Sequence, residues 1–152
     1  MKAITIIQPW ATLIALGEKR FETRSCSTKY RGLLAIHAGK KLDREACMRE
    51  PLKSVLLSHG YTSGNLPTGA VVAVVRLDEC WSVSRCLRGG VVLKVDRKEV
   101  ANEKLIGEQE EAFGYYHECR FGRELALVEQ LWNPIPVKGM QRLWNWNDDK
   151  RD

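Results

Sequence analysis

The chain begins with an alternating run of apolar residues, Lys2–Ile7, that is rich in Ile and Thr and predicts a β-strand. A short helix is predicted next, over Trp10–Leu16. Pro9 suits the first turn of a helix, and Gly17 suits the position just past its end. Apolar residues surround most of this helix, so we expect it to be buried.

The pattern beyond this helix predicts strands separated by helices and loops. Strands or extended segments are predicted over Phe21–Arg24, Leu33–Ala38, Gly69–Leu77, Val91–Val95, Leu125–Leu131 and Asn133–Val137. Helical spacing is found in Leu42–His59, where Pro51 should kink or split the helix, and in Arg97–Phe113, as one or two short helices. Tyr61–Thr68 is predicted to be a loop. The fold class that follows is α+β, a small mixed β-barrel with helices inserted between strands.

Length and composition place these elements in one domain. The chain has 152 residues, of which 44% are hydrophobic and 28% charged, values that exclude disordered, collagen-like and coiled-coil proteins. We assign residues 1–146 to a single domain and 147–152 to a loose polar tail. No stretch approaches the roughly 20 apolar residues that span a bilayer. Gln8 and Pro9 interrupt the apolar N-terminal run, so we expect a cytoplasmic protein without a membrane partner. The sequence leaves the oligomeric state open.

The five cysteines cannot all pair within the chain, and their spacing contains no CxxC motif. Reduced thiols are the simplest interpretation. A zinc site can be drawn from Cys80, Cys86, His117 and Cys119, but the spacing matches no common zinc module, and we expect no metal or cofactor. The GxGxxG, P-loop, HExxH and GxSxG motifs are absent from the sequence, which argues against nucleotide-fuelled and zinc-protease chemistry.

Positive charge is concentrated in the first half of the chain. The net charge is +5, yet residues 1–76 carry 12 Lys and Arg against 5 Asp and Glu, whereas residues 77–152 carry 12 against 14. The excess is densest between Lys19 and Lys53. A phosphate backbone would require such a region, but a solvated surface has the same composition.

The stretch Gly17–Ser25 combines charges of both signs with a predicted buried helix and strand. Glu22 and Arg24 share one strand face and can pair, which would orient the guanidinium toward an anion or a base edge. Lys19 could contact a phosphate or act as a base if its pKa were lowered. An ion pair that merely fixes the helix–strand corner fits equally well. His37, in an apolar strand, is more typical of a core histidine with one hydrogen-bond partner.

Five aromatic residues in the second half of the chain could stack on bases, and core packing is the alternative for most of them. They are Tyr115, Tyr116, Trp132, Trp144 and Trp146.

Several motifs, in order along nearly the whole chain, resemble the ASCH (activating-signal-cointegrator homology) domain. They are Ile6-x-Gln8-Pro9-Trp10-Ala11, Gly17-x-Lys19-x-x-Glu22-x-Arg24-Ser25, Thr28–Gly32, Ile36–Lys41, Gly69–Val72 with Asp78, Phe113-Gly114-x-Tyr116, Pro134–Gly139, and Leu143-Trp144-x-Trp146.

The resemblance implies a barrel similar to the pseudouridine-synthase-and-archaeosine-transglycosylase (PUA) fold, with a cleft that binds RNA or another single-stranded nucleic acid. Carried over by position, Lys19, Glu22 and Arg24 line that cleft. Trp10, Ser25 and His37 lie near it, and Lys40 and Lys138 stand at its rim. Similar sequences have aromatic residues where this chain has Cys26 and, often, near Ala126, so the ligand or the width of the pocket should differ here.

The resemblance also leaves enzyme alternatives open. Small members hydrolyse the modified nucleoside N4-acetylcytidine with a Lys-x-x-Thr pair and a distant Glu. Here Lys19 matches the Lys, but Glu22 replaces the Thr, and a carboxylate cannot stand in for a hydroxyl nucleophile. Other members are ribonucleases that use a divalent metal. In either enzyme, Lys19 and Glu22 would be the catalytic candidates. A cleft for a small anion or a protein tail is a third alternative.

Overall fold

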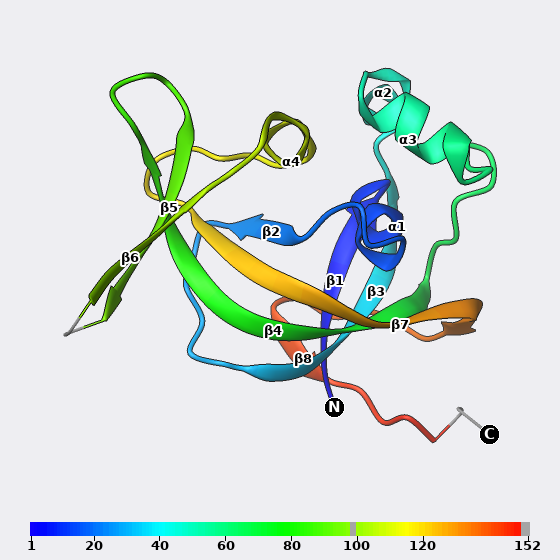
Figure 1. Cartoon of the computed structure of the whole chain (residues 1–152). Coiled ribbons are helices and arrows are strands. Elements are labelled where there is room, and N and C mark those ends of the chain that lie inside the picture. Colours follow the sequence, from blue (N-terminus) through cyan, green and yellow to red (C-terminus); the bar gives the residue numbers. More distant parts are fainter. Residues whose placement is uncertain (98–99, 150–152) are drawn as a thin grey trace.

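The structure is a computed structural model that describes residues 1–97 and 100–149, which form eight strands and four short helices (Figure 1). The strands are β1 (Lys2–Gln8), β2 (Phe21–Arg24), β3 (Gly32–Leu42), β4 (Ala70–Arg85), β5 (Val91–Arg97), β6 (Val100–Leu105), β7 (Phe121–Pro136) and β8 (Leu143–Asn145). The helices are α1 (Trp10–Ala15), α2 (Arg44–Met48), α3 (Leu52–Ser58) and α4 (Glu108–Phe113). The predicted α+β class is confirmed. Residues 150–152 of the predicted tail lie outside the described residues.

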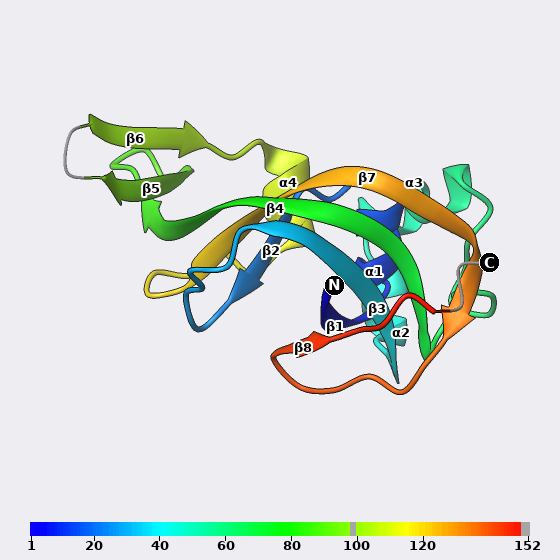
Figure 2. The same ribbon diagram turned by 90° about the horizontal axis from the view of Figure 1, so that it is seen from below.

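The strands form one mixed sheet in the order β2-β7-β4-β3-β1-β8, and the hairpin of β5 and β6 is attached to β4. Among the strand pairs of the described residues, β1 and β3 run parallel and the others antiparallel. Figure 2 shows that the sheet is strongly curved and that α1 lies within its curve, while the β5–β6 hairpin projects from one end.

The predicted barrel is not closed, because β2 and β8 are the two ends of the sheet in the described part of the chain. Side chains occupy the outer edge of β2 instead of a neighbouring strand. The Glu110 carboxylate accepts hydrogen bonds from the backbone N–H groups of Arg20 and Phe21, each at 3.1 Å. The Arg120 guanidinium donates from Nη2 to the Thr23 carbonyl oxygen at 3.1 Å. These contacts satisfy backbone groups that a closed barrel would pair with another strand.

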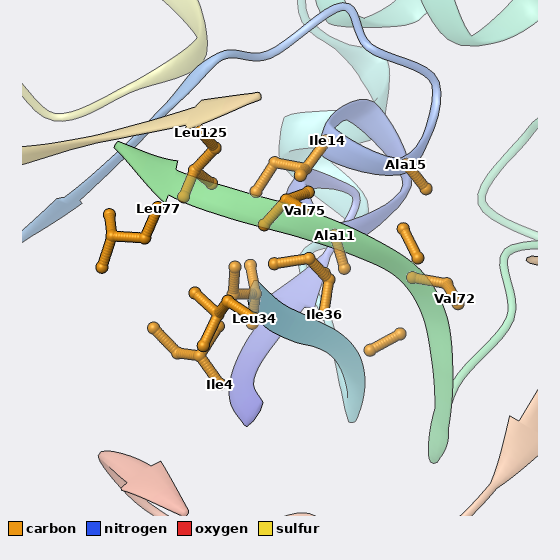
Figure 3. Close-up of a cluster of buried hydrophobic side chains, with 13 residues drawn as sticks. Ile4, Ala11, Ile14, Ala15, Leu34, Ile36, Val72, Val75, Leu77 and Leu125 are labelled. Carbon is orange, nitrogen blue, oxygen red and sulfur yellow. The ribbon is translucent and has the colours of Figure 1, made fainter. Parts of the chain in front are cut away.

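The core inside the curve consists of small and branched apolar side chains. Ala11, Ile14 and Ala15 of α1 pack there against Ile36 and Val75, and Figure 3 shows these side chains converging from the helix and the sheet. Five successive residues of α1 are buried, which confirms the prediction of a buried helix. Full burial of a Leu or Ile side chain, such as Ile14, contributes about 1.5–3 kcal/mol, so this short helix is stabilised by packing rather than by its own length.

Gln8 fixes the start of α1. Its side chain is fully buried; Oε1 accepts from the Thr12 N–H at 3.0 Å, and Nε2 donates to Thr12 Oγ1 and to the Pro67 carbonyl oxygen, each at 2.7 Å. Gln8 therefore caps the helix and ties it to the loop before β4.

Three predictions from the hydrophobic pattern are corrected. Residues 100–105 form β6 and only 108–113 of the predicted Arg97–Phe113 helical region is helical, while residues 98–99 lie outside the described residues. A spacing of four residues suits one face of a strand as well as of a helix, and the pairing of β6 with β5 decides between them. The strand predicted to end at Leu77 continues to Arg85, because Trp81 and Val83 alternate with serines and are buried. Extended segments predicted separately join in β7.

The predicted helix at Leu42–His59 is split at Pro51 into α2 and α3, as one of the two stated alternatives requires. In the described residues, no helix is both long enough and apolar enough to cross a bilayer.

Candidate functional site

A cleft of about 620 Å³ lies between β1 and β2, where the sheet is open. We call it the β1–β2 cleft. β8 pairs only with Lys2–Ile4 of β1, so the edge beyond Ile4 faces this space. The cleft is lined by Thr5, Ile6, Ile7, Trp10, Lys19, Glu22, Thr23, Arg24, Arg49, Glu50, Leu52, Ala112, Phe113, Gly114, Tyr115 and Arg120. Four of these side chains are basic and two are acidic, so the cleft favours an anionic ligand.

The end of α1 places Lys19 in the cleft. Gly17 has φ of +75°, a left-handed conformation that suits glycine at the end of a helix. The Gly17 N–H donates to the Ile14 carbonyl, and the Glu18 N–H donates to the Leu13 carbonyl, each at 3.0 Å. This hydrogen-bond pattern is the Schellman motif. It reverses the chain direction, so the next residues return toward the sheet.

Lys19 is an unusual lysine because only 2% of its surface is exposed and its Nζ has no hydrogen-bond partner among the described residues. Burial lowers the pKa of this amine, while the nearby carboxylates of Glu22 and Glu110 act in the opposite direction. A buried amine without a partner is costly for folding. Such a group is therefore a candidate for binding a ligand or for proton transfer.

Glu22 and Arg24 point from the same face of β2 and form the predicted pair. Arg24 Nε donates to Glu22 Oε1 at 3.1 Å, and Arg24 Nη2 donates to the Thr5 carbonyl oxygen at 2.9 Å. Arginine has five N–H donors, so these two contacts fix the guanidinium and leave further donors for a ligand. Glu22 and Thr5 thus orient the Arg24 guanidinium at the cleft, and its positive charge is not completely neutralised.

Tyr115 supplies an exposed aromatic face to the cleft. The residue is 62% exposed, and its backbone N–H donates to Thr23 Oγ1 at 3.3 Å. The Arg120 guanidinium carbon lies 5.0 Å from the ring centroid, while Arg120 Nε donates to the Tyr115 carbonyl at 3.1 Å. The His117 ring centroid lies 5.4 Å from that of Tyr115. The ring is therefore held in place by Arg120 and His117, and the exposed remainder of its surface could stack on a base.

The structure brings together four of the eight predicted binding residues. Trp10, Lys19, Glu22 and Arg24 line the β1–β2 cleft. Ser25 is exposed just beyond the end of β2 and does not line it.

His37, Lys40 and Lys138 instead line a second cavity of about 760 Å³, which we call the His37 pocket. Thr5 lines both cavities. His37 Nε2 donates to the Val137 carbonyl oxygen at 2.9 Å, because a carbonyl can only accept. This is the core histidine with one hydrogen-bond partner that the apolar strand indicates, and burial lowers its pKa.

The sequence did not single out Arg49 and Arg120 as site residues. Tyr115 was one of five aromatic residues, for most of which packing was the favoured alternative. One signal in the sequence could have pointed to Tyr115 and Arg120, namely their position in or next to a motif of the family resemblance. Tyr115 is the variable position inside the Phe113-Gly114-x-Tyr116 motif, and Arg120 follows the motif four residues later. Phe113 and Tyr116 of this motif are buried. The surrounding core places these neighbouring residues at the cleft.

The two departures from the family pattern lie outside the β1–β2 cleft. Cys26 is exposed and does not line it. Ala126 lines a further cavity of about 390 Å³, which Lys19 also borders. All five cysteines are free thiols. Over residues 1–97 and 100–149, no three His, Cys, Asp or Glu side chains converge to hold a metal ion.

Comparison with known protein families places the chain in a family. The model of the family described as ASCH domain matches residues 4–131 of the chain. This range includes every residue that lines the β1–β2 cleft, whereas Lys138 of the His37 pocket lies beyond it. Comparison with the curated proteins gives no match.

Proposed function

Because the chain belongs to the ASCH domain family, we propose that it is an RNA-binding or single-stranded nucleic-acid-binding module. Its β1–β2 cleft takes a nucleotide or base. One observation carries this proposal: the same cavity is lined by Lys19 and Arg24. The buried amine of Lys19 has no hydrogen-bond partner among the described residues, and the guanidinium of Arg24 is oriented by its contacts. Both groups are donors, and a nucleotide offers phosphate and base-edge acceptors.

The size and walls of the cleft support the same ligand class. A volume of about 620 Å³ lies within the range of small-molecule sites. Trp10 and Tyr115 supply aromatic surface, and stacking on such surfaces accepts any base. Arg49, which is exposed at the margin, is suited to a neighbouring phosphate.

The test is binding of a fluorescent single-stranded RNA oligonucleotide, followed by anisotropy over a series of salt concentrations. We expect binding that weakens steeply as salt rises, because Lys and Arg contacts to phosphates release counterions. A matched DNA oligonucleotide shows whether the ribose hydroxyl matters. Absent binding, or binding that is independent of salt, would contradict the proposal.

A second candidate function, hydrolysis of RNA or of an acylated nucleoside, is favoured by the lowered pKa of Lys19. A neutral amine can accept a proton, and Glu22 and Glu110 lie near enough to influence it. The test incubates the protein with RNA, with and without a divalent metal, and separately with N4-acetylcytidine. Turnover that Glu22→Gln abolishes would favour the enzyme, and an inert protein would leave the binding module as the function.

A further inference from the structure

Arg123 lies beside the β1–β2 cleft, and none of the motifs that point to nucleic acid includes it. On β7 it is directly opposite Glu22 of β2 and directly opposite Cys80 of β4. Side chains directly opposite in neighbouring strands share one face of the sheet, with Cβ atoms about 4.5–5.5 Å apart. Arg123 therefore projects from the same face as Glu22 and Arg24, two residues of the cleft.

The guanidinium of Arg123 is buried and has no bonded partner in the part of the chain that the structure describes. Only 5% of the residue is exposed, and Nε has no hydrogen-bond partner. Within the described residues, no hydrogen bond or ion pair joins this guanidinium to another side chain or to a carbonyl. Arginines that are almost fully buried are normally paired, because an uncompensated buried charge destabilises the fold.

The nearest charges do not resolve this imbalance. Glu22 faces Arg123 across the strands, but its carboxylate is already bonded to Arg24. Burial and the positive charge of Arg24 both lower the pKa of Arg123, while Cys80, Cys26 and Glu22 act in the opposite direction. Glu22 is thus bonded to Arg24 alone, and among the described residues the positive charge of Arg123 has no bonded negative partner.

We infer that Arg123 and Arg24 form an oxyanion subsite beside the cleft, and that its ligand is a phosphate group of the bound nucleotide. The planar guanidinium binds phosphate through two parallel N–H···O bonds, and an arginine held by neighbouring contacts has less entropy to lose on binding. The assignment to a nucleotide rests on the proposed nucleic-acid function. The lack of a bonded negative partner and the unpartnered donors of Arg123 are independent of that function.

The experiment uses Arg123→Met, which keeps the packing volume of the side chain and removes its charge. Arg76→Met is the matched control, because Arg76 is an exposed arginine on β4 that pairs with Asp78 outside the cleft. Thermal unfolding is measured with and without inorganic phosphate, and RNA affinity is measured by anisotropy. Arg24→Met serves as a second arm, since its side chain is 31% exposed and its loss disturbs the core less.

We expect phosphate to raise the Tm of the wild type and of Arg76→Met, and to leave the Tm of Arg123→Met unchanged. Without phosphate, Arg123→Met should be at least as stable as the wild type, because it removes a buried unpaired charge. RNA affinity should fall about tenfold or more, the usual cost of a lost hydrogen bond to a charged group. Arg24→Met should lose the same phosphate protection.

Two outcomes would overturn the subsite while leaving the nucleic-acid function intact. One is phosphate protection or RNA affinity in Arg123→Met equal to that of the wild type. The other is a marked fall in its Tm together with unchanged phosphate protection in Arg24→Met, which would make Arg123 a structural residue. A third outcome concerns the ligand. If the protein binds no RNA but phosphate still raises its Tm in a way that depends on Arg123, the assignment to a nucleotide is overturned and the subsite is a site for free phosphate.

Discussion

Arg24 of β2 donates from Nη2 to the backbone carbonyl of Thr5 on β1, at 2.9 Å. This hydrogen bond crosses the opening between two strand edges that do not pair with each other. A side chain thus performs the bridging that a strand ladder would perform in a closed barrel, and it leaves room for a cleft.

Substituting Arg24 with lysine tests whether this bridge depends on the guanidinium fork. Lysine keeps the charge but cannot hold Glu22 and Thr5 with fixed planar donors. We expect Arg24→Lys to lower the free energy of unfolding by about 1 kcal/mol and to weaken RNA binding. Urea denaturation and anisotropy measure the two effects, with Arg76→Lys as the exposed control. Unchanged values in both measurements would mean that only the positive charge at this position matters.

Lys19→Met should separate binding from folding. We expect RNA affinity to fall about tenfold, equivalent to about 1.4 kcal/mol, while the fold is kept because the buried amine has no partner to lose. Circular dichroism and anisotropy provide the measurements. Collapse of the fold would instead favour an ion pair that fixes the helix–strand corner.

The stability of Lys19→Met relative to the wild type should also depend on pH. The folded-state pKa of Lys19 lies below 10.5, so between that pKa and 10.5 the unfolded chain binds more protons than the folded chain. Wild-type stability therefore gains from this group as pH rises through that window. The advantage of Lys19→Met should be largest below the folded-state pKa and should shrink toward pH 10.5.

Tyr115→Ala should weaken RNA binding through the loss of a stacking surface. Base–aromatic stacking contributes about 1–3 kcal/mol per base, so affinity should fall about five- to a hundredfold. Tyr115→Phe should keep most of the affinity, because the ring provides the stacking. Trp132→Ala is a matched control, since Trp132 is 82% exposed and lies outside the β1–β2 cleft. Equal losses in Tyr115→Ala and Trp132→Ala would argue against a specific stacking position.

His37 should make the protein sensitive to mild acid. Burial lowers its pKa below 6.5, so between 6.5 and the folded-state value the unfolded chain binds more protons. Stability should therefore fall as pH drops through this window. Denaturant unfolding between neutral and acidic pH should show a shallower loss for His37→Gln. A wild type and variant with identical pH profiles would mean that His37 does not contribute.

The hydrophobic pattern predicted elements that are bounded by local signals. The strand at Lys2–Ile7, the helix between Pro9 and Gly17, and the break at Pro51 all agree with the structure to within one or two residues. Each depends on the conformational limits of Pro or Gly, or on strand alternation, which act over only a few residues. The pattern failed for residues 100–105, where helical and strand spacing coincide and pairing with β5 decides.

The sequence by itself determined the fold class, the family resemblance and the charged motif of Lys19, Glu22 and Arg24. Those features are carried by residue types at fixed local spacings. Only the tertiary structure decided that the sheet stays open at β2, and that His37, Lys40 and Lys138 line a separate pocket. It alone placed Arg123 without a partner beside Glu22. The physical reason is that strand register and burial depend on residues about a hundred positions apart, such as Glu22 and Arg123, which no local spacing relates.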